Sequence, residues 1–302
     1  MNDKNQPKFI EQIDQPNFVG WLYLPFPICF FLLMIFNYFA SKDINVGDAI
    51  QIMNEQFGKN ISFLMLIVPL AIACLFLLFW VKFVHQQSLT SFTTSRATID
   101  WKRVFFSFSI WGSFTISMVL IDFYFNKTDY VIQFDINQFI VFAIIALLLI
   151  PLQTSFEEYF FRGYLMQYLG VITKTRWIPF VFTSVAFGLM HAGNPEIDTL
   201  GSWVLIYYVG TGFFLGMLTL LDEGLELALG FHAANNLIGA LLVTTEWGAF
   251  QTNSILLDQS EPNLSWELFL PMLVIYPLLL FIFGKKYRWN NWIKQLFHYQ
   301  KN

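Results

Sequence analysis

The chain has 302 residues, of which 56% are hydrophobic and 19% aromatic, while only 13% are charged. Soluble proteins carry roughly 25% charged residues, so this composition excludes an ordinary soluble domain and predicts a polytopic membrane protein. The formal net charge of −4 gives no reason to expect a nucleic-acid partner. The two cysteines, Cys29 and Cys74, fall in apolar runs and offer neither a disulfide framework nor a metal-ligand spacing.

Eight apolar runs follow one another along the chain. They lie at about 18–40, 61–84, 104–125, 138–168, 178–191, 203–221, 227–245 and 264–284. A membrane-spanning helix needs roughly 20 residues, and all but one of the runs reach or approach that length. The fifth run, 178–191, is shorter, so its helix should either continue past His191 or enter the membrane only partway. The sequence therefore predicts an all-α bundle of about eight transmembrane helices, forming a single transmembrane domain over residues 1–302.

The basic residues are unevenly distributed between the loops. With both termini inside, 13 of the 17 Lys and Arg residues lie on the cytoplasmic side, 3 lie on the other side, and Arg162 falls within a span. An excess of Lys and Arg marks the cytoplasmic face, so we expect cytoplasmic N- and C-termini and an even number of helices. The polar N-terminus does not resemble a cleavable signal peptide. The short tails, with no organelle-retention signal, favour a multi-pass protein of the bacterial inner membrane.

The sixth run contains the small-residue pattern G-x-x-x-G at Gly212 and Gly216. Small residues at this spacing let two helix backbones approach closely. We expect this face to pack inside the bundle, and a dimer interface is the alternative.

Three ionisable side chains lie inside the fourth apolar run: Glu157, Glu158 and Arg162. A charge at the bilayer centre costs roughly 3 kcal/mol or more, so these groups should face a protein interior or a water-filled cavity. Glu158 and Arg162 are four residues apart and predict an ion pair on one helix face. Glu157 points elsewhere and has no local basic partner, which would let it act as a base. The alternative is that both glutamates belong to one structural network.

Two further polar pairs occur in later apolar segments. His191 and Asn194 end the fifth run, and His232 and Asn236 share one face of the seventh. A single histidine in a membrane helix is as often a packing residue as a functional one. Two histidines and a glutamate at comparable depths in three helices favour a site, which we expect to open toward the cytosol.

Taken together, these residues form three ordered patterns. The patterns are E-E-x-x-x-R at Glu157, Glu158 and Arg162, F-x-x-x-H at Phe187 and His191, and H-x-x-x-N at His232 and Asn236. In order and spacing they resemble the three motifs of the CPBP family, which comprises the CAAX prenyl endopeptidases and the bacteriocin-processing and immunity proteins. The resemblance covers residues 157–236.

This resemblance implies an intramembrane glutamic endopeptidase with its catalytic core at about 138–245 and with no cofactor or metal. Glu157 would be the general base that activates a water, and His191 would help to hold and polarise that water. His232 and Asn236 would donate hydrogen bonds to the oxyanion of the tetrahedral intermediate. The remaining pair, Glu158 and Arg162, would orient the helix and tune Glu157.

The implied partners are the lipid bilayer and a membrane-associated peptide or protein substrate, such as a prenylated C-a-a-X protein or a leader peptide. Other intramembrane protease chemistries lack their motifs, since the chain has no G-x-S-x-G, H-E-x-x-H or G-x-G-D. Two alternatives stay open. Two histidines and a glutamate are a possible zinc ligand set, and a non-catalytic immunity or transport protein would also place charges in the membrane.

Overall fold

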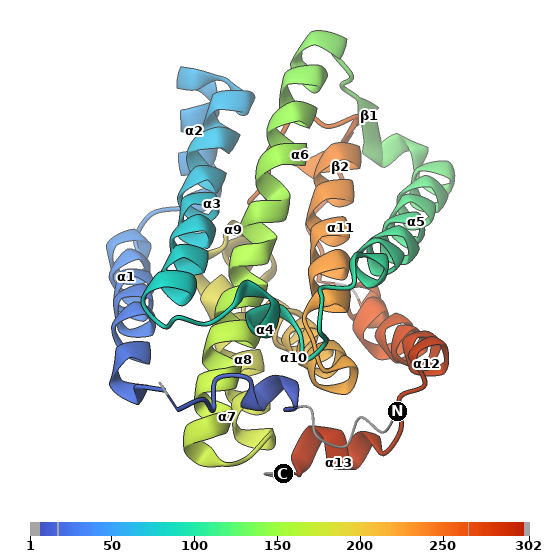
Figure 1. Ribbon diagram of the computed structural model, residues 1–302. Helices are drawn as coiled ribbons and strands as arrows, with labels where there is room; N and C mark the ends of the chain where they lie inside the picture. The colour runs from blue at the N-terminus through green and yellow to red at the C-terminus, as the bar shows by residue number, and fades with distance from the viewer. Residues whose placement is uncertain (1–6, 17, 265, 299–302) are drawn as a thin grey trace.

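The computed structural model describes residues 7–16, 18–264 and 266–298 (Figure 1). The extreme termini, residues 1–6 and 299–302, for which a cytoplasmic location was predicted, lie outside the described residues. The structure is mostly helical. Its helices are α1 (Pro25–Ser41), α2 (Val46–Phe57), α3 (Lys59–Phe83), α4 (Leu89–Thr93), α5 (Trp101–Phe125), α6 (Ile136–Glu158), α7 (Met166–Thr173), α8 (Trp177–Met190), α9 (Pro195–Leu200), α10 (Val204–Asp222), α11 (Glu226–Leu242), α12 (Tyr276–Tyr287) and α13 (Trp292–Phe297).

The predicted membrane character is confirmed. Across the described residues, five helical stretches are long and apolar enough to cross a membrane: Gly20–Ser41, Lys59–Phe83, Trp101–Phe125, Ile136–Thr173 and Val204–Asp222. The other three predicted runs hold the shorter helices α8, α11 and α12. The helix of the fifth run ends at Met190 and is continued only by a 3₁₀ turn at His191–Gly193. The helix α2 lies outside all eight predicted runs.

A small β-sheet was not predicted. In the described part of the chain, β1 (Tyr130–Ile132), β2 (Val243–Thr245) and β3 (Leu256–Asp258) form a three-stranded sheet in the order β1-β3-β2. The pair β1–β3 is antiparallel and the pair β2–β3 is parallel. The labelled strands β1 and β2 lie at the end of the bundle opposite the marked chain ends (Figure 1). Strands of three residues are too short to show a sequence periodicity, which explains why the purely helical prediction missed them.

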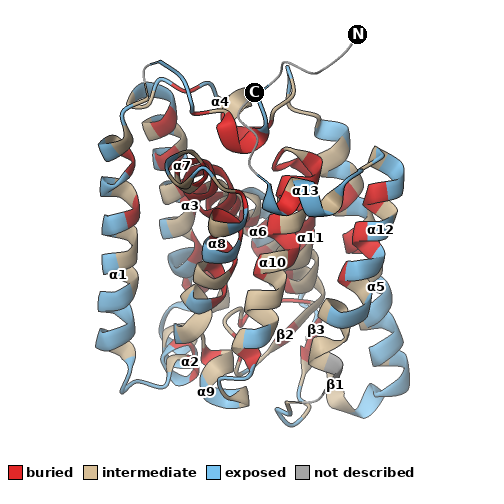
Figure 2. Cartoon of the chain, turned by 90° about the horizontal axis from the view of Figure 1, so that it is seen from below, coloured by how far each residue is buried: buried red, intermediate tan, exposed pale blue. Residues whose placement is uncertain are grey.

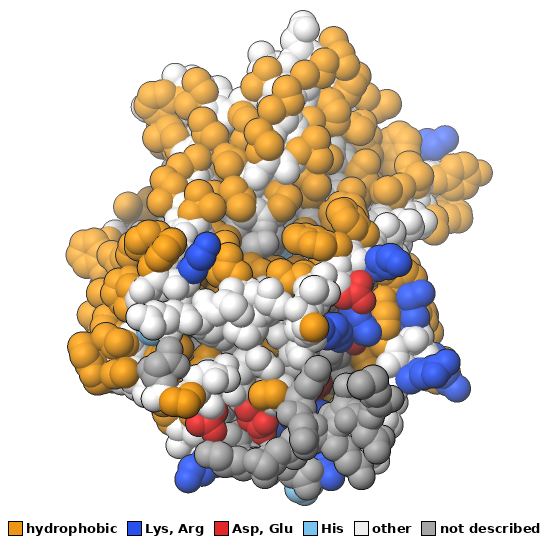
Figure 3. Space-filling model, in the orientation of Figure 1, with side chains coloured by type: hydrophobic (Ala, Val, Ile, Leu, Met, Phe, Trp, Pro, Cys, Tyr) orange, Lys and Arg blue, Asp and Glu red, His pale blue; other side chains and the backbone are white. Residues whose placement is uncertain are grey.

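Buried residues concentrate in the inner helices of the bundle. Figure 2 shows them on α6, α10 and α11, whereas α1 and α5 at the periphery are largely exposed. The exposed side chains on α1 are apolar, and Phe36 is 72% exposed. On the face drawn in Figure 3, hydrophobic side chains cover the upper part and Lys and Arg gather mainly over the lower part. A lipid-facing surface explains this distribution, because acyl chains are as apolar as Leu or Phe.

The G-x-x-x-G face of α10 packs against α8 inside the bundle, as predicted. A Cβ atom on Gly212 would lie 2.4 Å from the backbone oxygen of Ser184, and one on Gly216 would lie 2.9 Å from the ring of Phe180. The contact with the Ser184 backbone could be relieved only by moving one helix away from the other. Glycine at position 212 therefore sets the distance between α8 and α10, and this spacing positions the polar residues described next.

Candidate active site

The two glutamates stand where α6 changes its winding. Glu157 and Glu158 are the last residues of α6, and the chain continues directly into a π-helical turn, Tyr159–Leu165, which carries Arg162. A π turn adds one residue to the ordinary helical repeat and is found frequently at functional sites. The polypeptide thus remains helical through this segment while its side chains are re-aimed toward α8, α10 and α11.

The predicted ion pair between Glu158 and Arg162 is confirmed. Arg162 Nη1 donates to Glu158 Oε1 at 3.0 Å, and both side chains are completely buried. Two contacts from other helices support the arginine. Its Nη2 donates to the carbonyl oxygen of Gly212 at 3.0 Å, and its guanidinium lies 4.2 Å from the ring centre of Phe187. Buried charges persist only when they are paired and hydrogen-bonded, and this arrangement ties the π turn to α8 and α10.

His232 joins α11 to both glutamates. Its Nδ1 lies 2.8 Å from Glu158 Oε1, and its Nε2 lies 3.7 Å from Glu157 Oε2. The carboxylate of Glu158 already accepts from Arg162, so Nδ1 carries the hydrogen of this second bond. In that tautomer Nε2 is an acceptor while the ring is neutral and becomes a donor only in the imidazolium form. Glu157 Oε2 has no hydrogen-bond partner among the described residues.

Gln153 is a site residue that sequence reasoning missed. It lies one turn before Glu157 on α6 and donates from Nε2 to Glu157 Oε1. Its Oε1 accepts from Asn236 Nδ2 at 3.2 Å. The buried Gln153 amide therefore links the side chains of Glu157 and Asn236 through two hydrogen bonds. The available signal was a polar residue four positions before a glutamate in an apolar run.

His191 lies beside this network rather than within it. Its Nδ1 is 2.8 Å from the carbonyl oxygen of Phe187, and its ring stacks on Tyr208 with centroids 4.1 Å apart. In the described structure no hydrogen bond joins His191 to Glu157. The ring of Phe187 separates the two histidines, with centroids 4.9 Å from His191 and 5.8 Å from His232. Tyr208 had no distinguishing sequence signal, because aromatic residues are abundant throughout the chain.

The structure thus gathers five of the six predicted site residues into one bonded network and places the sixth at its edge. The joined residues are Glu157, Glu158, Arg162, His232 and Asn236. Two central members are buried, since Glu157 is 4% exposed and His232 is 6% exposed. In residues 7–16, 18–264 and 266–298, no cluster of three or more His, Cys, Asp or Glu side chains is arranged to hold a metal ion.

Comparison with known proteins identifies the family of the region that contains these residues. Residues 136–238 match the family model described as type II CAAX prenyl endopeptidase, Rce1-like. These residues form an Rce1-like domain. The resemblance inferred from the three motifs is therefore confirmed. The Rce1-like domain begins with α6, ends within α11, and contains every site residue named above.

A bacterial relative has a similar sequence. The uncharacterized protein YyaK of Bacillus subtilis (strain 168) is 32% identical over 195 residues, which is 64% of this chain. The match covers 65% of the length of YyaK, slightly less than two thirds. No solved structure matches the chain.

Proposed function

We propose that this chain is an intramembrane glutamic endopeptidase that hydrolyses a peptide bond with a water activated by Glu157. The observation that carries this proposal is that only one of the two Glu157 carboxylate oxygens has a hydrogen-bond partner within the described part of the chain. Gln153 holds Oε1, while Oε2 has no partner in the described structure and faces His232 Nε2 at 3.7 Å. A buried carboxylate with one fixed and one unengaged oxygen is suited to accept a proton from a water.

The remaining groups complete a reaction without a covalent intermediate. Glu157 takes a proton from water, and the hydroxide attacks the carbonyl carbon of the scissile peptide bond. The tetrahedral intermediate collapses as Glu157 returns the proton to the leaving amine nitrogen. We assign His191 to holding and polarising the water, a role in which its ring orientation is fixed by Phe187 and Tyr208.

Two groups are available for the oxyanion. Asn236 uses one amide hydrogen on Gln153 and retains the other. His232 can donate from Nε2 when its ring is in the imidazolium form. Oxyanion donors are worth roughly 3–4 kcal/mol each in enzymes where they have been removed. In this scheme Glu158 and Arg162 position the helix and His232.

In the membrane, we propose that α8, α11 and α12 accompany the five longer spans to give eight transmembrane segments in a single domain, with the catalytic core at 138–245. The bias of basic residues supports cytoplasmic termini and a site that opens toward the cytosol. A bacterial cell membrane is the proposed location. The substrate would be a membrane-associated protein or peptide, for example a prenylated C-a-a-X protein or a leader peptide.

The alternatives make different demands on the same residues. A zinc-dependent protease would use the two histidines and a glutamate as ligands, and its activity would be lost on chelation and restored by zinc. An immunity or transport protein would use the buried charges without turnover. Its function would survive loss of the Glu157 carboxylate, whereas peptide hydrolysis would not.

The test compares protein N-termini in membranes that contain wild type, Glu157→Gln or the control Glu246→Gln at matched levels. Glu246 is exposed and lies outside the network. N-termini that appear with wild type and with the control, and disappear with Glu157→Gln, are the expected result and would identify the substrate. Loss of these termini on chelation, with recovery on adding zinc, would overturn metal independence. Identical N-termini in all three membranes, with a cellular phenotype retained, would favour the non-catalytic alternative.

A further inference from the structure

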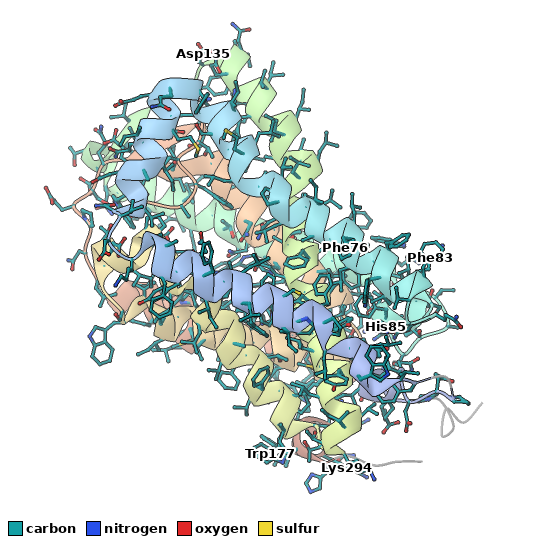
Figure 4. The ribbon with its side chains drawn as sticks, turned by 90° about the vertical axis from the view of Figure 1, so that its left-hand side faces the viewer. Phe76, Phe83, His85, Asp135, Trp177 and Lys294 are labelled. Carbon is teal, nitrogen blue, oxygen red and sulfur yellow. The ribbon has the colours of Figure 1, made fainter. Side chains whose placement is uncertain are left out.

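A polar cavity lies away from the proposed active site, between the N-terminal segment, the start of α8 and the C-terminal helix. Its volume is about 170 Å³, and the lining residues include Lys8, Arg176, Glu223, Asn291, Lys294 and His298. Figure 4 shows Trp177 and Lys294 close together at the end of the molecule opposite Asp135. This is the end that the distribution of basic residues assigns to the cytoplasm.

The cavity has an excess of positive charge. Arg176 is 3% exposed and donates from Nη2 to Leu220 O and to Glu223 Oε1, while its Nε has no hydrogen-bond partner among the described residues. Lys8 Nζ lies 3.7 Å from the same Glu223 oxygen. Lys294 forms no ion pair within the described structure. Three cationic side chains thus line the cavity together with one carboxylate, Glu223, while Glu11 lies outside the lining but interacts with Arg176 and Lys8. The Arg176 Nε is buried and makes no hydrogen bond in the described structure.

The surroundings of the cavity are those of a membrane surface. In the short helix α13, Leu296 is buried, whereas Ile293 is 72% exposed and Phe297 is 46% exposed. Ile293 and Phe297 are four residues apart and share one face of the helix. Trp177, at the start of α8, is also exposed. Apolar side chains next to basic ones are typical of helices that lie at the level of lipid headgroups.

We propose that this cavity binds a phosphate group, carried either by the headgroup of an anionic lipid or by a soluble molecule. Arginine presents N–H groups in a fork that matches phosphate oxygens, and lysine adds a mobile point charge. The amide of Asn291 adds a further donor. A volume of 170 Å³ equals that of about six liquid waters, which accommodates a phosphate and its linking atoms while acyl chains lie outside against Ile293 and Phe297.

Equilibrium titration of the full chain in phosphate-free maltoside detergent tests this proposal. The probes are dioctanoyl phosphatidylglycerol, inorganic phosphate, and dioctanoylglycerol, which has the same chains without phosphate. The variants are Lys294→Gln and Lys8→Gln on two walls of the cavity. Lys285→Gln is the charge-matched control, because Lys285 lies on α12 outside the lining. Size-exclusion profiles and melting temperatures verify that each variant is folded.

Saturable binding of a phosphate probe is expected, about fivefold weaker in each cavity variant than in wild type and unchanged in the control. Binding of phosphatidylglycerol but not inorganic phosphate identifies a lipid ligand, and the reverse identifies a soluble one. Equally weakened binding in all three variants would show that the probes respond only to surface charge, and it would overturn the proposed site. Failure of both phosphate probes to bind wild type, or equal binding of dioctanoylglycerol, would also overturn it.

Discussion

The helix α1 and the segment formed by α6 with its π turn are both strongly apolar, but α1 is largely exposed whereas the second half of the other segment is buried in the protein. The helix α1 has no Asp, Glu, Lys, Arg or His between Pro25 and Ser41, and most of its side chains are exposed. The other segment buries Glu157, Glu158 and Arg162. It meets α1 only through apolar contacts such as Phe30 with Phe160, whose ring centres are 4.5 Å apart. In a membrane, hydrophobicity does not separate inside from outside, and the positions of the polar residues do.

Breaking the buried Glu158–Arg162 ion pair should cause the largest loss of stability, because it leaves a charge unpaired in the apolar interior. Arg162→Met removes the partner of a completely buried Glu158, and we expect a loss of about 3–5 kcal/mol in unfolding free energy. Thermal unfolding in detergent measures it. The double variant Glu158→Gln/Arg162→Met should recover part of the loss, because it leaves no unpaired charge. An Arg162→Met protein that melts at the wild-type temperature would contradict the assigned importance of the pair.

A single methyl group added between α8 and α10 tests whether these helices must lie as close together as they do. Gly212→Ala places a Cβ 2.4 Å from the backbone oxygen of Ser184 and should cost about 1–3 kcal/mol of stability. Gly239→Ala on α11 is the matched control, because a Cβ there meets no heavy atom within 4 Å. The control should be neutral or slightly stabilising, since alanine is the better helix former. Equal melting temperatures for the two variants would show that α8 and α10 are not held at this spacing.

Removing the Gln153 amide, which bridges Glu157 and Asn236, should have a smaller effect that falls mainly on catalysis. Gln153→Ala removes the hydrogen bonds to Glu157 and Asn236, and we expect kcat to fall about tenfold with little change in KM, since a hydrogen bond to a charged group contributes about 1.5–3 kcal/mol. Its pH–rate profile should also move, because the carboxylate of the base loses a donor. A purely structural role would lower the melting temperature and leave the pH profile of the remaining activity unchanged.

The smallest effect is expected on the lipid-facing helix. Phe36→Leu on α1 exchanges one apolar side chain that is 72% exposed for another, and stability in lipid nanodiscs should change by less than about 0.5 kcal/mol. Phe36→Asp at the same position should impair insertion, because a charge would then face acyl chains. Tolerance of aspartate would place this face in a protein interface rather than in lipid.

Sequence reasoning recovered the buried ion pair within one helical segment, although it missed the bond from Gln153 to Glu157 on α6. The spacing of Glu158 and Arg162 predicts their pairing because residues four apart share a helix face. The bond from His232 to Glu158 joins residues 74 positions apart, and only the packing of α11 against α6 creates it. Motif order indicated that the two belong to one site without indicating which nitrogen meets which oxygen. His191 was expected beside Glu157, and the stacking on Tyr208 that orients it instead depends on α10.

The π turn at Tyr159–Leu165 makes the register of this segment sensitive to chain length. A π turn contains one residue more than the α-helical path it replaces, and each residue of an α-helix turns the chain by about 100°. Deleting one residue from this turn would restore regular winding and leave α7 in register, whereas the side chains inside the turn, Arg162 among them, would be redirected by up to about that angle. Arg162 and Gly212 would lose their alignment although no residue of the three motifs had changed. Among related chains, the number of residues between the glutamates and α7 should therefore vary less than their identity.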